Sequence, residues 1–291
     1  ELALKEEERG YRGLWHFSYN TRGDDFIDPR GPAGANAWCL NALYAAVLHS
    51  QDPGMLDWIN WAVENYLFKL QVLEEKDPRW GLIRAGLYNA DDVTEKEAMG
   101  YHVFEGDLNR TYQHAILEHC ADVAGTFRLA YRANQKFNPR EKKFLKILVE
   151  RHDWLLQGMR RCFWQEDHFV SALDPHGELY KGTDGQPSIA VDNNTWPAHI
   201  FLPYDVELAQ NSARYVEKRF LTKTPPAEVE DLPEGTAQMG LEGVFFFPAT
   251  FEDPFVQVPE EQRPRLEKLL HPEAALGYVV FLMDLADYIP D

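Results

Sequence analysis

The sequence predicts an all-α fold in which consecutive helices pair into antiparallel hairpins. Three observations support this: apolar residues recur every three or four positions along most of the chain, connections between helical stretches are short, and strand-like patterns are confined to one short region. With 291 residues, 45% of them hydrophobic, the chain can bury a substantial core. No low-complexity linker divides it, so we expect one domain over residues 1–291.

The first predicted hairpin joins a helix over 35–50 to a helix over 53–72. Trp38, Leu43 and Val47 mark the inner side of the first helix at helical spacing. Asp52 can cap the second helix and Pro53 can open it. A connection this short requires the two helices to lie side by side and antiparallel.

Two further pairs follow the same pattern. We expect helices over 107–133, with Asp107 as its cap, and 140–161, then a short β-hairpin within 162–181, then helices over 194–202 and 206–221. Residues 222–233 are predicted to form an exposed loop, and 272–288 a nearly all-apolar helix that closes the fold as a buried element. The expected core consists of apolar residues on the inner faces: Trp38, Leu43, Val47, Ile116, Cys120, Val123, Phe127, Leu148, Leu155, Val280 and Met283.

Four predicted helix starts share short motifs. The sequences 34–38 (GANAW) and 192–196 (DNNTW) have the form x-x-Asn-x-Trp, and 105–107 (EGD) and 234–236 (EGT) place Glu-Gly before a capping residue. Ordinary helix capping explains such motifs equally well. An (α/α) toroid also presents polar and carboxylate-bearing residues at several helix starts along one rim.

At these motifs the sequence resembles the six-hairpin toroid glycosidases, in particular bacterial proteins in which Gly-x-Asn-Ala-Trp opens an inner helix. The resemblance covers 34–43, 105–112, 192–196 and 234–238. It implies an (α/α) toroid of antiparallel hairpins whose inner-helix starts line a sugar-binding cleft. A complete ring has twelve helices and this chain shows fewer, with no clear pair before Ala35. Short helices missed by the pattern, an incomplete ring, or a further segment or partner subunit would account for the difference.

Glycoside hydrolysis requires a carboxylic acid that protonates the leaving oxygen and a second carboxylate on the other face of the sugar. Glu105 is our candidate acid, because Phe104 beside it could desolvate the carboxyl group and raise its pKa. Asp192 is the candidate base or nucleophile, since it follows an apolar run. Both residues could instead be simple helix caps. The reserve acids are Asp24, Asp25, Asp107 and Glu234.

Sugar rings bind to flat aromatic faces and to planar amide or guanidinium groups. The candidate aromatic platforms are Trp15, Tyr19, Trp38, Tyr112, Trp196 and Phe246. The candidate hydroxyl-reading side chains are Asn36, Arg110, Asn193, Asn194 and Gln238. A long polar loop over 17–36 leads into the first helix, and we interpret it as a substrate loop because its acids do not match the spacing of a calcium loop.

Composition and motifs exclude several classes of function. The net charge of −18, from 47 acidic and 29 basic residues, disfavours nucleic acid and membrane surfaces as partners. No metal-binding, phosphate-binding or nucleophile motif is present, so we expect no cofactor and no metal. Cys39, Cys120 and Cys162 show no CxxC spacing, which mildly favours a reducing compartment without excluding the periplasm.

Three functions remain open. The first is a glycoside hydrolase acting on an oligo- or polysaccharide. The second is a sugar epimerase or polysaccharide lyase on the same scaffold, for which the candidate proton-abstracting residues are His102, His114, His119 and His199. The third is a non-catalytic carbohydrate-binding or assembly module. Fold alone does not decide among them.

Overall fold

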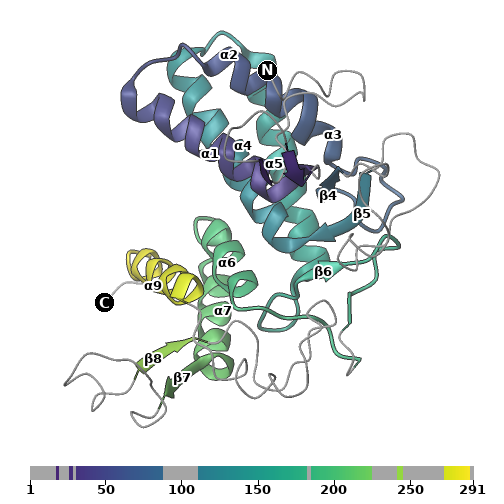
Figure 1. Cartoon of the computed structure of the whole chain (residues 1–291), viewed down its shortest axis with the longest axis vertical. Helices are drawn as coiled ribbons and strands as arrows, with labels where there is room; N and C mark the ends of the chain where they lie inside the picture. The colour runs from purple at the N-terminus through teal and green to yellow at the C-terminus, as the bar shows by residue number, and fades with distance from the viewer. Residues whose placement is uncertain are drawn as a thin grey trace. The chain divides into compact units, whose positions relative to one another are not determined.

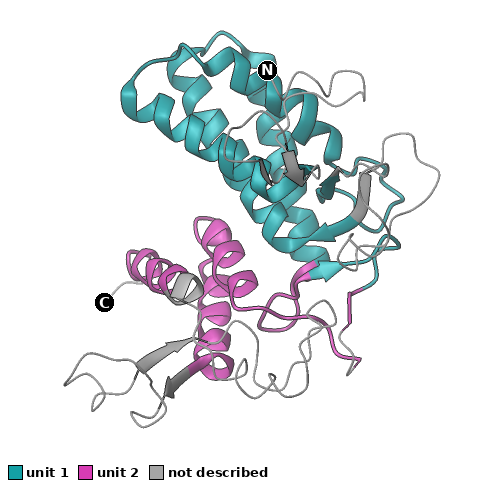
Figure 2. Ribbon diagram, in the orientation of Figure 1, with its two compact units in different colours: residues 1–162, 172–178 teal, residues 163–171, 179–291 magenta. Residues whose placement is uncertain are grey.

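The computed structural model describes residues 18–19, 26–28, 31–87, 111–181, 185–224, 241–244 and 272–288. They belong to two compact units, one formed by residues 1–162 and 172–178 and the other by 163–171 and 179–291 (Figure 2). Most of the described residues are helical, and a small antiparallel sheet of four strands accompanies the helices (Figure 1). The helical fold is thus confirmed, whereas a strictly all-α fold is not. A single domain over 1–291 stays a prediction.

The first unit contains the two long hairpins that the sequence predicts. Helix α1 spans Ala33–Ser50 and ends at Gln51, which adopts a left-handed conformation (φ 60°). A continuous helical stretch follows as α2 (Leu56–Ala62), a π-helical turn η2 (Val63–Leu67) and α3 (Phe68–Leu70). Helices α4 (Leu117–Phe137) and α5 (Lys142–Phe163) form the second pair, and α1 packs along α4 (Figure 1).

The prediction of a helix from residue 107 was wrong at its start, because Thr111–Ile116 is strand β5. This strand lies in a sheet of order β3-β4-β5-β6, in which β3 is Gly31–Pro32, β4 is Arg84–Leu87 and β6 is Ala172–Leu173. Pairing with β4 and β6 satisfies the backbone of β5 on both sides, which the local helical pattern could not reveal. A separate two-stranded pair joins β1 (Ser18–Tyr19) to β2 (Phe26–Asp28).

The second unit contains the remaining predicted helices. The chain forms a 3-10 turn η3 (Asp192–Asn194) and the helices α6 (Trp196–Phe201), α7 (Val206–Arg219) and α9 (Pro272–Ala286). The predicted β-hairpin begins with a tight turn in which Trp164 bridges Phe169. The loop prediction over 222–233 was wrong where strand β7 (Leu221–Thr224) pairs with β8 (Leu241–Val244), and the rest of that loop lies outside the described residues.

Helix α9 is less buried than the sequence predicts. Its inner face buries Tyr278, Phe281 and Leu285, in a helix that packs against α6 and α7. Val280 and Met283, which we expected in the core, are 44% and 67% exposed. An apolar helix has no polar face to mark its solvent side, so the sequence could not tell which face is covered.

The rest of the predicted core is only partly confirmed. The buried members are Val47, Cys120, Val123, Phe127, Leu148 and Leu155. Trp38 was wrongly placed in the core, since it is 52% exposed, and Leu43 and Ile116 are only half-buried. Helix α1 buries Ala37, Leu40 and Tyr44 instead, so its inner face is rotated from the one that we expected.

The burial difference between Leu148 and Ile116 gives a stability test. Leu148→Ala should lower the free energy of unfolding by about 2–5 kcal/mol, because a side chain that is 1% exposed leaves a cavity when it is truncated. Ile116→Ala should cost clearly less, because Ile116 is only half-buried. Urea denaturation followed by tryptophan fluorescence measures both values. Equal losses would show that the two burial states are wrongly assigned.

Candidate functional site

Of the seventeen residues predicted to form a sugar site, eight can be placed at least in part. The other nine lie outside the described residues: Trp15, Asp24, Asp25, Glu105, Asp107, Arg110, Glu234, Gln238 and Phe246. Tyr19 and Tyr112 are placed through their backbone, in β1 and β5. Asn36 and Trp38 belong to the first unit, and 192–196 to the second.

The sheet of the first unit places the start of α1 beside the strand that precedes residues 88–110. Gly31 pairs with Leu87, and Leu87 pairs with Thr111, so β4 lies between β3 and β5. Helix α1 begins directly after β3. The Tyr66 hydroxyl donates a hydrogen bond to the Gly31 carbonyl and fixes β3 from the side of the π-helical turn. Leu87, the last described residue before the segment that carries Glu105, therefore pairs with the strand that leads into the helix of Asn36 and Trp38, and Thr111 lies one strand further.

The two side chains at the start of α1 have opposite environments. Asn36 is 1% exposed, and its amide donates a hydrogen bond to the Pro32 carbonyl (3.0 Å), so it braces the start of the helix. Trp38 is 52% exposed, although it is only two residues further along the same helix. Trp38 thus has the exposure that a sugar platform requires, whereas Asn36 has the burial of a structural residue.

Gly34 allows helix α1 to approach helix α4 closely. A Cβ atom at this position would lie 2.5 Å from Cδ2 of His119 and 3.1 Å from Oδ2 of Asp122. The His119 Nδ1 lies 3.1 Å from the carbonyl oxygen of Ala85 in β4. Desolvation lowers the pKa of His119 from 6.5 to about 4, although the Ala85 carbonyl acts in the opposite direction. His119 is therefore a neutral ring that packs α1, α4 and β4 together.

This neutral histidine should make the first unit sensitive to acid. The folded pKa of about 4 lies below the unfolded value of 6.5, so the unfolded chain binds the proton more readily. The free energy of unfolding should therefore fall as the pH decreases from about 6.5 to 4, by at most about 3 kcal/mol from this group. His119→Gln should remove that part of the pH dependence. Urea midpoints at several pH values would show it, and identical slopes in parent and variant would contradict the assignment.

In the second unit, a run of buried polar residues precedes helix α6. Asp192, Asn193, Asn194 and Thr195 are at most 8% exposed. One carboxylate oxygen of Asp192 accepts a hydrogen bond from the Asn193 backbone N–H (2.8 Å). Asp192 is thus a largely buried carboxylate in the 3-10 turn that precedes α6.

The Asn194 side chain has a structural role in this run of buried residues. Its amide nitrogen donates to the carbonyl oxygens of Phe169 (3.0 Å) and Ala190 (3.1 Å). Its oxygen accepts from the Phe169 backbone N–H (2.8 Å) and from the Ser212 hydroxyl (3.2 Å). With 0% exposure and these four hydrogen bonds, Asn194 joins the hairpin, the start of α6 and α7.

One side of α6 meets α9 through groups that can bind or transfer protons. Asp192, Trp196 and His199 follow each other at spacings of four and three residues, which places them along one side of a helical stretch. The His199 Nε2 lies 2.5 Å from Oδ2 of Asp284 in α9. Gly277 of α9 lies against the indole of Trp196, where a Cβ atom would be 3.0 Å from Nε1. Sequence reasoning missed Asp284, although an acid within the otherwise apolar stretch 274–286 was a visible signal.

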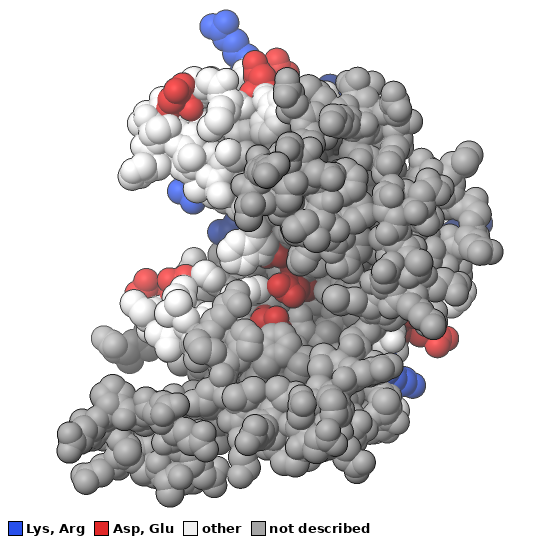
Figure 3. All heavy atoms as spheres, in the orientation of Figure 1, with Lys and Arg blue, Asp and Glu red and all other residues white. Residues whose placement is uncertain are grey.

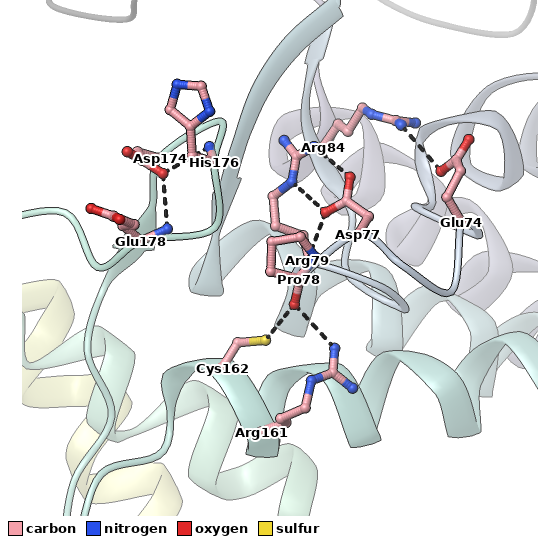
Figure 4. Close-up of polar contacts among 10 residues, drawn as sticks. All are labelled: Glu74, Asp77, Pro78, Arg79, Arg84, Arg161, Cys162, Asp174, His176 and Glu178. Atoms are coloured by element: carbon pink, nitrogen blue, oxygen red, sulfur yellow. Dashed lines mark hydrogen bonds and ion pairs between the residues drawn. The ribbon is translucent and has the colours of Figure 1, made fainter.

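A second polar cluster, also missed, lies around the loop before β4 (Figure 4). The Arg79 guanidinium pairs with Asp77 (2.6 Å), and this hydrogen-bonded pair lowers the pKa of Asp77. The Pro78 carbonyl accepts hydrogen bonds from Arg161 (3.4 Å) and from the Cys162 thiol (3.4 Å) at the end of α5. Because these groups satisfy one another, the cluster holds the loop against α5.

No three His, Cys, Asp or Glu side chains in the described part of the chain gather closely enough to hold a metal. Figure 3 shows the described acidic side chains of one face in red and the described basic ones in blue. Among the described helices, none combines the length and apolarity needed to cross a bilayer.

No protein-family model matches the chain, and no curated protein matches its sequence.

Proposed function

We propose that the chain is a glycoside hydrolase that cleaves an oligo- or polysaccharide on an (α/α) toroid scaffold. Glu105 acts as the general acid, and Asp192 acts as the base or nucleophile. The observation that carries the proposal is the strand register at Gly31, Leu87 and Thr111. It supports the idea that the motif starting at Gly34 and the motif containing Glu105 serve one rim, since Gly31, which precedes the first motif, pairs with Leu87, which precedes the segment of the second.

The environment of the described candidates supports a neutral sugar as substrate. Trp38 is 52% exposed, and Asp192 is a buried carboxylate in the turn before helix α6. The net charge of −18 disfavours polyanionic saccharides. The ring is completed, in this proposal, by a further segment or a partner subunit.

The roles of the two carboxyl groups can be separated with substrates of different leaving groups. Glu105→Gln keeps the shape and removes the proton, so hydrolysis of a natural oligosaccharide should fall about 100-fold or more. A dinitrophenyl glycoside needs no proton on its leaving oxygen, so the same variant should retain most activity on it. Asp192→Asn should lose activity on both substrates. As a base it would no longer activate the attacking water, and as a nucleophile it would no longer attack the sugar carbon.

The control variant makes the same change from a carboxylate to an amide at another position. Glu74→Gln alters a carboxylate that is 70% exposed and pairs with Arg84 at 3.6 Å, so it should leave kcat and KM unchanged. Full activity of Glu105→Gln and Asp192→Asn on a hydrolysed α- or β-glucan would refute the assignment. Binding of oligosaccharides without any hydrolysis would favour a non-catalytic carbohydrate-binding module.

A further inference from the structure

The outer side of helix α9 is an apolar surface that faces solvent. Of the thirteen large hydrophobic side chains that are exposed in the described part of the chain, six lie between residues 276 and 288. Leu276 and Met283 have the largest exposed fractions among them, 65% and 67%. Single apolar residues are common at protein surfaces, whereas a contiguous apolar patch marks a surface that binds a partner.

Four of these side chains form a stripe along one side of the helix: Leu276, Val279, Val280 and Met283. They are separated by three, one and three positions, a spacing that is the same in both directions along the helix. A two-fold axis that crosses α9 between Val279 and Val280 therefore places Leu276 of one copy opposite Met283 of the other. The stripe is thus self-complementary, as an interface between two identical chains related by a two-fold axis requires.

The charge and the area of the patch both suit a second copy of the chain. The stretch 274–283 contains no Asp, Glu, Lys or Arg, although the net charge of the chain is −18, so two copies can meet here without placing like charges face to face. The five exposed side chains between Leu276 and Met283 offer roughly 500 Å² on each copy, and a pair would bury roughly 1,000 Å², the lower limit of a specific interface. This area fits a dimer that forms reversibly.

We propose that the outer face of α9 is a dimer interface, in which α9 of one copy packs antiparallel against α9 of a second copy across a two-fold axis. Val279 and Val280 lie at the centre of the interface, and Leu276 of each copy contacts Met283 of the other. None of these four residues belongs to the candidate sugar site, so the interface does not depend on the proposed hydrolysis.

The concentration and the salt dependence of the mass test the interface on the parent protein. In sedimentation equilibrium the mass should rise from 33.6 kDa towards twice that value between about 1 and 100 μM protein. Added NaCl should increase the dimer fraction, because it screens the repulsion between two chains of charge −18 and leaves the apolar contact intact. A dimer held by opposite charges would instead dissociate as the salt concentration rises, and that result contradicts the proposal.

Charged substitutions beside the two-fold axis distinguish this face from any other. Val280→Glu and Val280→Lys should each remain at 33.6 kDa, because each places like charges on both sides of the axis. An equimolar mixture of the two variants should form dimers again, since the acidic and the basic side chain then face each other. Val149→Glu is the matched control: Val149 is 43% exposed, against 44% for Val280, but it lies in α5 of the first unit, so this variant should dimerise like the parent.

Circular dichroism checks that the variants are folded, which we expect because Val280 is exposed in the single chain. A parent that stays monomeric at every concentration overturns the proposal, and so does a dimer that persists in both Val280 variants. A mixture of the two folded variants that remains monomeric also overturns it. A monomeric parent that binds neutral phosphatidylcholine vesicles, and loses this binding in Val280→Glu, would assign the face to a lipid surface in place of a second copy.

Discussion

Replacing Gly86 by alanine should destabilise the first unit by about 3 kcal/mol or more. Gly86 in β4 has φ 140°, a backbone conformation that side chains disfavour. A Cβ atom there would overlap the Gly31 carbonyl oxygen and lie 2.7 Å from Pro32 Cα and 2.9 Å from Ala33 N. These atoms belong to the backbone of β3 and the start of α1, so they cannot move aside without displacing the helix.

Gly185→Ala is the matched control for this prediction. Gly185 also has a positive φ (75°), but a Cβ atom there would meet nothing within 4 Å. Its replacement carries only the conformational penalty, about 1–2 kcal/mol. Guanidinium denaturation of both variants would separate the steric cost from the conformational one. Equal losses at the two positions would mean that β3 and β4 are not packed as closely as described.

Asn194→Ala should cost about 3–5 kcal/mol in the second unit, since unsatisfied buried polar groups cost roughly 1–3 kcal/mol each. The Phe169 backbone N–H and carbonyl both lose their side-chain partner, in a place with 0% exposure for the asparagine itself. Ser212 keeps its hydrogen bond to the backbone carbonyl of residue 194 (2.9 Å), so the hydroxyl on α7 still has a partner in the variant. Thermal unfolding monitored by circular dichroism would record the loss.

Asn65→Ala provides the comparison for Asn194. The Asn65 amide donates one hydrogen bond to the Trp61 carbonyl within its own helical stretch (2.8 Å). That carbonyl has other helical partners, so truncation should change the stability by less than about 1 kcal/mol. A loss at Asn194 as small as at Asn65 would show that the hairpin, α6 and α7 are not joined through this side chain.

The sequence predicted the helices well because their signal is local. Hydrophobic periodicity located α1, α5, α6, α7 and α9 to within a few residues. It misassigned Thr111–Ile116 because Tyr112, Ala115 and Ile116 fit helical spacing, and only pairing with Arg84–Leu87, distant in sequence, favours the strand. It also misjudged which face of α1 is buried, since a rotation of one position exchanges Trp38 for Ala37.

The candidate site was predictable only in part, for the same physical reason. Motif spacing singled out Asp192 and Trp196, and both lie at the start of α6. The partners that define their surroundings come from elsewhere in the chain: Asp284 from α9, and Phe169 and Ser212 around Asn194. Such contacts depend on tertiary packing and carry no local signature.

The pairing of Leu87 with Thr111 also bears on how the chain can vary. Residues opposite each other in an antiparallel ladder have Cα atoms only about 4.5–5.5 Å apart, so the ends of the segment 88–110 are already brought together by the sheet. The entropy lost on closing a loop grows only with the logarithm of its length, by about 0.6 kcal/mol for each doubling. The segment can therefore lengthen, shorten or change its composition at little thermodynamic cost to the first unit. Its sequence can diverge while the described helices and sheet stay the same.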